Sequence, residues 1–179
     1  EFRRVLFRSF SDTATNVSGL WSKFFDSVSA LSSNAGGTAE REDLLSMGNS
    51  LVTRFRQLDG QLRNLDGEVN NGLLAGAAEI NRLSGEIARL NVSIGVNAST
   101  ASPDLLDRRD ALVAELVGYT GGTAVSQDGG MLNVFTAGGQ PLVVGNQASQ
   151  VTTTADPYRP ERLQLALIGP TGTIPMDQR

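Results

Sequence analysis

Apolar residues recur in a heptad rhythm between Leu51 and Ile94, and this pattern constrains the fold more than any other feature of the chain. Most successive members are separated by steps of four and three residues, which is the pattern of a coiled-coil seam. Two four-residue steps follow each other at Leu65, Val69 and Leu73, and such a stutter locally relaxes a left-handed supercoil. The predicted helix-packing seam consists of Leu51, Phe55, Leu58, Leu62, Leu65, Val69, Leu73, Ile80, Leu83, Ile87, Leu90 and Ile94.

The seam lies in a helix that we predict over residues 38–95, with Thr38 as its N-cap. At about 1.5 Å per residue, a continuous helix of this span forms a rod of about 85–90 Å. A rod of that length cannot fold back on a small domain, so most of its apolar seam requires partner helices. Because several glycines weaken the helix, the segment 67–76 is where we expect a kink.

A shorter amphipathic helix is predicted over residues 18–33, with Ser18 as its N-cap. It carries a helix anchor of three aromatic residues, Trp21, Phe24 and Phe25. Aromatic residues at this spacing pack against other helices far more often than they line a ligand site, so we interpret them as a packing anchor.

A third helix is predicted over residues 103–117, from the N-cap Ser102 to a stop at Gly118. The turn of residues 95–101 is short enough to make it an antiparallel neighbour of the long helix. A dense charge cluster lies on it, and paired carboxylates can perform acid/base catalysis. Two adjacent arginines instead favour a salt-bridge face, either solvated or between subunits, formed by Asp107, Arg108, Arg109 and Asp110.

After Tyr119 the chain changes to short apolar runs separated by Asp-Gly and Gly-Gly pairs, which are typical of hairpin turns. Strands are predicted over residues 123–126, 131–136, 141–144 and 162–168, with a further turn over residues 169–172. The predicted fold class is therefore α+β and mainly α: a long antiparallel helical rod of coiled-coil type over residues 10–118, followed by a small, incomplete antiparallel β domain over residues 119–179. Residues 1–9 differ in composition from the rest and resemble a cloning or sequencing scar.

The composition excludes most enzyme classes. The chain contains no Cys and no His, so thiolate nucleophiles, thiolate zinc sites and the commonest general base are all missing. Its net charge of −4 argues against nucleic acid as a partner, and no apolar stretch is long enough to cross a membrane. We therefore expect no catalytic residues, no cofactor and no metal. The triplet Asn91-Val92-Ser93 matches a glycosylation signal, which we interpret as a chance match.

Four segments, in this order, resemble the hook-associated protein 1 family of bacterial flagella. They are WSKFFDSV at residues 21–28, EINRLSGEIARLN at 79–91, DLLDRRDAL at 104–112 and VFTAGGQPLVVG at 134–145. The resemblance implies a structural role without catalysis: secretion through the flagellar export apparatus and assembly as a ring in the extracellular flagellum, between hook and filament. The implied partners are other copies, the hook protein and the second junction protein. A flagellar export chaperone would bind only a C-terminal region absent here.

Two other classes remain as alternatives. A coiled-coil interaction or stalk module of another bacterial surface or signalling protein would share the heptads, but the predicted β hairpins count against it. An enzyme would have to be a metal-dependent hydrolase that uses only Asp and Glu. Because the seam has no partner within the predicted elements, we also expect the chain to self-associate or to fray along Leu51 to Ile94.

Overall fold

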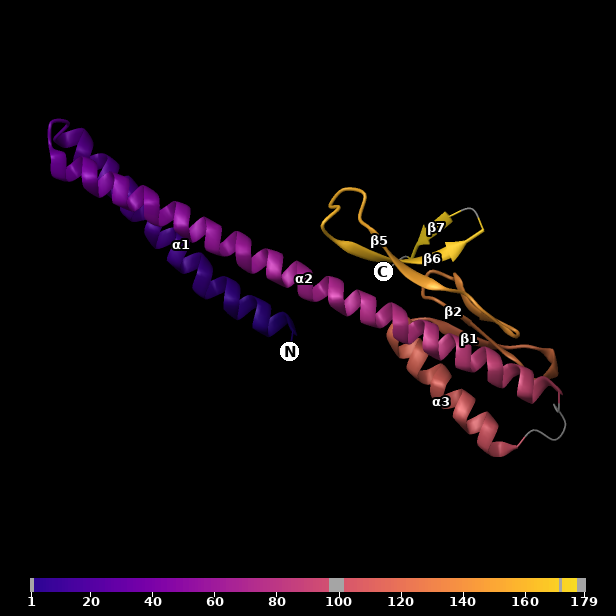
Figure 1. The fold of residues 1–179 in the computed structure, drawn as a ribbon. Helices are drawn as coiled ribbons and strands as arrows, with labels where there is room; N and C mark the ends of the chain where they lie inside the picture. Colours follow the sequence, from indigo (N-terminus) through magenta and orange to yellow (C-terminus); the bar gives the residue numbers. More distant parts are fainter. Residues whose placement is uncertain (1, 97–101, 171, 177–179) are drawn as a thin grey trace. The chain divides into compact units, whose positions relative to one another are not determined.

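The computed structural model describes residues 2–96, 102–170 and 172–176, and side chains from residue 17 onward. Contacts divide the chain into two compact units, Glu1–Leu65 and Asp66–Arg179. The helix α2 (Thr38–Val96) contributes residues to both units. In the described residues, three α-helices are followed by short strands, all paired antiparallel (Figure 1). The predicted class, mainly α with a small antiparallel β part after the helices, is confirmed.

In the first unit, α1 (Phe2–Ser33) and the first part of α2 form an antiparallel helix hairpin (Figure 1). The turn between them is closed by the N–H of Gly37, which donates to the carbonyl of Asn34 at 3.0 Å. The side chain of Asn34 donates in turn to the carboxylate of Glu40 at 2.8 Å. The predicted N-cap at Ser18 is wrong, because α1 already begins at Phe2. Residues 2–18 contain no Gly or Pro, so nothing in that stretch ends a helix.

The helix α2 runs without interruption through the glycines of segment 67–76. The predicted turn starts within it, since α2 ends at Val96, and residues 97–101 lie outside the described part of the chain. The helix α3 (Pro103–Thr120) has Ser102 at its N-cap, as predicted, although the hydroxyl makes no capping hydrogen bond. The predicted stop at Gly118 is too early. The chain leaves the helix at Gly121, which adopts a left-handed φ of 61° and donates its N–H to Val117.

The strands form two sheets. The first has the order β1-β2-β3-β4 and the second the order β5-β6-β7. The strands are β1 (Thr123–Ser126), β2 (Leu132–Phe135), β3 (Pro141–Val144), β4 (Gln147–Ala148), β5 (Val151–Ala155), β6 (Leu163–Gly169) and β7 (Gly172–Pro175), with a 3-10 turn η1 (Asp128–Gly130) between β1 and β2. The sequence prediction did not include β4, β5 and β7. The predicted turn at residues 169–172 includes one residue outside the described chain.

The core of the second unit forms around the C-terminal half of α2. Ile80, Leu83 and Ile87 are buried there, in one cluster with residues of α3 and of both sheets. The contacts therefore divide the chain inside α2, and not at the predicted change from helices to strands after residue 118. The reason is physical: short strands cannot bury their apolar faces alone, so they share the core that the helix provides.

Asparagine side chains on α2 bind the backbone of both sheets. Asn91 is fully buried, and its amide nitrogen donates to the carbonyls of Leu132 (2.7 Å) and Gly145 (2.6 Å). Its amide oxygen accepts from the N–H of Leu132 at 3.1 Å. One side chain thus joins the beginning of β2 to the turn that follows β3.

Two more asparagines of α2 bind the second sheet in the same two-way manner. Asn81 donates to the carbonyl of Val151 and accepts from its N–H, both at 2.7 Å. Asn70 donates to the carbonyl of Glu161 at 2.9 Å and accepts from the N–H of Leu163 at 2.8 Å. We call Asn70, Asn81 and Asn91 the asparagine clamps.

We predict that Asn91→Ala lowers the free energy of unfolding by about 3 kcal/mol. It removes three hydrogen bonds and leaves one buried N–H and two buried carbonyls without their partner. Denaturant unfolding followed by circular dichroism measures the change. Asn64→Ala, at an exposed asparagine of the same helix, is the matched control. Equal stability of the two variants would contradict a structural role for the clamp.

Candidate functional site

The predicted seam is covered along the C-terminal half of α2. Ile80, Leu83, Ile87 and Ile94 are buried, and Leu73 and Leu90 are half-buried. α3 and the two sheets supply this cover, so no further partner is required there.

Toward the N-terminal half of α2, the same seam divides into two rows. Leu51 is buried, and Leu58 and Leu65 are half-buried. The alternate positions remain in solvent: Phe55 is 50% exposed, and Leu62 and Val69 are each 47% exposed. These last three residues follow each other at seven-residue spacing, so they lie in one row along the helix. We call Phe55, Leu62 and Val69 the open stripe.

The predicted aromatic anchor is only partly used within the first unit. The rings of Trp21 and Phe25 meet edge to face, with centroids 5.5 Å apart. Phe24 is half-buried, and a Cβ added at Gly48 of α2 would lie 3.8 Å from its ring, so Phe24 faces α2. Trp21 and Phe25 are both exposed. Of the three anchor residues, Phe24 therefore packs toward α2, while Trp21 and Phe25 are exposed to solvent.

The predicted salt-bridge face on α3 contains two arginines with different roles. Arg108 is exposed and lies 3.7 Å from the carboxylate of Glu86 on α2. Arg109 is buried, which a solvated face does not account for. Its guanidinium donates to the carbonyl of Gly130 at 2.6 Å and contacts the carboxylate of Asp110 at 3.3 Å. Arg109 thus fixes the turn η1 to α3. Asp107 is exposed.

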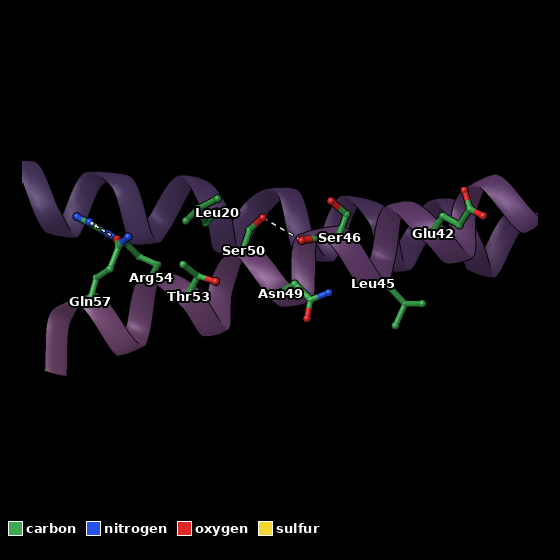
Figure 2. Close-up of a pocket in the computed structure, with 9 residues that line it drawn as sticks. All are labelled: Leu20, Glu42, Leu45, Ser46, Asn49, Ser50, Thr53, Arg54 and Gln57. Atoms are coloured by element: carbon green, nitrogen blue, oxygen red, sulfur yellow. Dashed lines mark hydrogen bonds between the residues drawn. The ribbon is translucent and has the colours of Figure 1, made fainter. Parts of the chain in front are cut away.

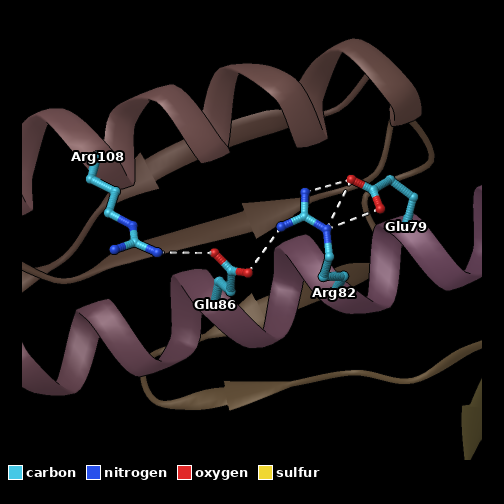
Figure 3. Close-up of polar contacts among 4 residues, drawn as sticks. All are labelled: Glu79, Arg82, Glu86 and Arg108. Atoms are coloured by element: carbon cyan, nitrogen blue, oxygen red, sulfur yellow. Dashed lines mark hydrogen bonds and ion pairs between the residues drawn. The ribbon is translucent and has the colours of Figure 1, made fainter.

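The ion pair between Arg108 and Glu86 belongs to a larger charge network along α2 (Figure 3). Arg82 binds the carboxylates of Glu79 and Glu86, one turn away on either side. The hydrogen bond from Arg82 lowers the pKa of Glu79, and the bond to Glu79 raises the pKa of Arg82. The two ion pairs of Arg82 lie within α2, and the pair of Arg108 with Glu86 joins α3 to α2.

An open groove of about 720 Å³ lies in the first unit (Figure 2). Leu20 of α1 and Leu45 of α2 supply its apolar atoms. Glu42 contributes a carboxylate, and Ser46 and Asn49 contribute polar groups between them. Arg54 contributes a guanidinium, so the groove combines apolar and polar surface with one negative and one positive charge.

Within the described ranges, no group of three or more His, Cys, Asp or Glu residues lies together so that it could hold a metal ion. None of the helices in that part of the chain is long and apolar enough to cross a membrane.

Sequence reasoning missed the asparagine clamps. Asn70, Asn81 and Asn91 recur at spacings of eleven and ten residues, which is close to three helical turns and places them near one face of α2. That spacing is the one signal that could have found them. Polar residues on a helix usually face solvent, and their strand partners lie 41 to 93 residues away in the sequence.

Comparison with known proteins places these features in a family. The model of the flagellar hook-associated protein FlgK helical domain matches residues 6–178. The flagellar hook-associated protein 1 of Salmonella typhimurium is 39% identical over 156 residues, which are 83% of this chain and 28% of that protein. Its Escherichia coli counterpart is 34% identical over 174 residues, which are 94% of this chain and 32% of that protein.

A solved structure shows the same fold. The flagellar hook junction protein FlgK from Burkholderia pseudomallei matches 90% of this chain with a TM-score of 0.77 and 30% identity, and the match covers 28% of that chain. The present chain spans less than a third of the length of each of these relatives.

The two neighbouring arginines of α3 give a matched test. We predict that Arg109→Ala lowers the free energy of unfolding by about 2 kcal/mol, because it removes a charged hydrogen bond from a buried side chain. Arg108→Ala is expected to change it by less than about 0.5 kcal/mol, since its ion pair is exposed and long. Thermal and denaturant unfolding measure both. Equal losses would show that Arg109 does not support the turn.

Proposed function

Because the chain belongs to the family of the flagellar hook-associated protein FlgK, we propose that it is part of a structural subunit that joins the hook of a bacterial flagellum to its filament. The subunit acts by helix packing and ring assembly, without catalysis. Its partners are other copies of itself, the hook protein and the second junction protein, and it works outside the cell after secretion. A flagellar export chaperone binds a C-terminal region of the longer protein.

The observation that carries this proposal is the open stripe. A helix of 59 residues keeps Phe55, Leu62 and Val69 half in solvent, although they continue the heptad rhythm of residues buried further along. Apolar rows at seven-residue spacing associate with other helices through knobs-into-holes packing. The exposed aromatics Trp21 and Phe25 on α1 add apolar surface of the same kind. The described residues thus present apolar surface suited to association with other helices.

The stripe gives a direct test in solution. We predict that the 179-residue chain self-associates, and that Phe55→Asp together with Leu62→Asp lowers its association constant by at least about tenfold, because carboxylates in a helix interface lose their hydration. Sedimentation equilibrium measures the constant. Val92→Asp is the control, since Val92 is also an exposed apolar residue of α2 but lies outside the stripe.

One observation would contradict association through the stripe. If light scattering shows a monodisperse monomer at every concentration, while circular dichroism shows that its helices are fully formed, the stripe does not drive association and the helix-packing proposal fails. The flagellar role has its own test. The longer protein with the two Asp substitutions is expected to leave cells without attached filaments and without swimming, while the Val92→Asp protein supports both.

A further inference from the structure

One loop displays its aromatic side chain almost completely to solvent. Tyr158 is 94% exposed in the connection between β5 and β6. The loop is nevertheless closely held by hydrogen bonds. The carboxylate of Asp156 accepts from the N–H of Tyr158 (2.8 Å) and from that of Arg159 (3.0 Å), and the N–H of Arg162 donates to the carbonyl of Arg159 at 2.9 Å. Proline on either side, at positions 157 and 160, restricts the backbone further.

The base of the loop is fixed to α2. Arg162 forms an ion pair with Asp66 at 2.9 Å, and Asn70 binds the backbone of Glu161 and Leu163 on either side of it. An aromatic residue in an unsupported loop loses much conformational freedom when it binds a partner. Here the hydrogen bonds and the two prolines already restrict the backbone, so binding has to order little more than the exposed side chain of Tyr158.

Tyr and Arg are the residue types that carry most binding energy in protein interfaces. Tyr158 and the exposed Arg159 next to it form a surface that we call the knob. We propose that the knob docks into the groove of Leu20, Glu42 and Leu45 on a second copy of this chain. The inference rests on the proposed ring assembly and names one contact within it.

The groove fits the knob by its chemistry. Leu20 and Leu45 offer apolar atoms for contact with the Tyr158 ring, while Ser46 and Asn49 offer hydrogen-bond partners for its hydroxyl (Figure 2). The exposed carboxylate of Glu42 is the counter-charge for Arg159. Arg54 also lines the groove, but it lies twelve residues further along α2, about 18 Å away along the helix axis. Both halves of the contact are present on this one chain, which is the reason for choosing a second copy as the occupant.

The groove is also separate from the open stripe. With about 100° of rotation per residue, the groove residues of α2 lie on roughly the opposite side of the helix from Phe55 and Leu62. Helix association through the stripe therefore leaves the groove accessible. Because the knob and the groove are different surfaces, they can join successive copies head to tail, and such heterologous contacts generate rings when the rotation closes. A two-fold pair, in which each copy's knob fills the other's groove, would instead close as a dimer.

The test uses the whole chain and two variants, one for each half of the contact. Tyr158→Ala removes the knob, and Ser46→Trp fills the groove. Tyr119→Ala and Ser22→Trp make the same changes at exposed positions outside the contact and serve as matched controls. Sedimentation velocity over a concentration series gives the association constants, in the wild-type sequence and in the Phe55→Asp, Leu62→Asp background that removes association through the stripe.

In that background, Tyr158→Ala and Ser46→Trp are each expected to weaken self-association at least about tenfold, while the two controls leave it unchanged. A mixture of the two variants restores one intact contact, from the Ser46→Trp copy's knob to the Tyr158→Ala copy's groove. The mixture is therefore expected to form dimers and to stop there, whereas chains with knob and groove both intact in the same background form assemblies larger than dimers. A reciprocal two-fold contact would stop at dimers in both cases.

Two results would overturn the knob contact. One is equal association of Tyr158→Ala and Tyr119→Ala, and the other is a mixture in which no dimer forms. Neither affects the proposed junction role, which depends on the stripe: if the stripe variants abolish association and filament attachment while Tyr158→Ala changes neither, the junction proposal stands and the knob contact is wrong.

Discussion

The fold of the second unit depends on hydrogen bonds from helix side chains to strand backbone. A strand at the end of a small sheet has backbone N–H and carbonyl groups without a neighbouring strand to bind them. Asn81 binds both such groups of Val151, as a further strand would. Asn91 binds both backbone groups of Leu132, at the beginning of the inner strand β2 before its pairing with β3 starts, and also the carbonyl of Gly145. The helix α2 therefore supplies backbone partners that neighbouring strands do not supply, at the edge strand β5 and at the beginning of β2.

This arrangement explains why the residues of one heptad seam are buried along one half of α2 and partly exposed along the other. Where the clamps hold the sheets, the apolar residues Ile80, Leu83 and Ile87 are buried within the chain. Toward the other end, α1 covers only one row, and Phe55 and Leu62 remain exposed. The heptad rhythm itself is the same in both halves. The two halves differ in whether the asparagine clamps of α2 bind other elements of the chain.

Sequence patterns predicted the parts of the fold that depend on local or periodic signals. The seam, the Pro103 start of α3 and the strands at glycine-rich turns all follow from such signals. The missed features depend on distant partners. Nothing near Gly118 shows that the helix passes it and ends at Gly121, and the adjacent arginines 108 and 109 look alike although only the second is buried. The row Val-Thr-Thr-Thr of β5 has strand-forming residues but no alternation of apolar and polar residues, so periodicity did not indicate it.

The asparagine clamps and the ion pairs are two kinds of polar contact, and they lie in different parts of the molecule. Amide groups carry no charge, so they can be buried without the desolvation cost of an ion and their bonds do not weaken with salt. The ion pairs, by contrast, lie at the surface, where Arg82 joins Glu79 and Glu86 and Arg162 reaches Asp66. Hydrogen bonds from neutral asparagine side chains thus hold the sheets to α2, while the buried Arg109 holds the turn η1 to α3.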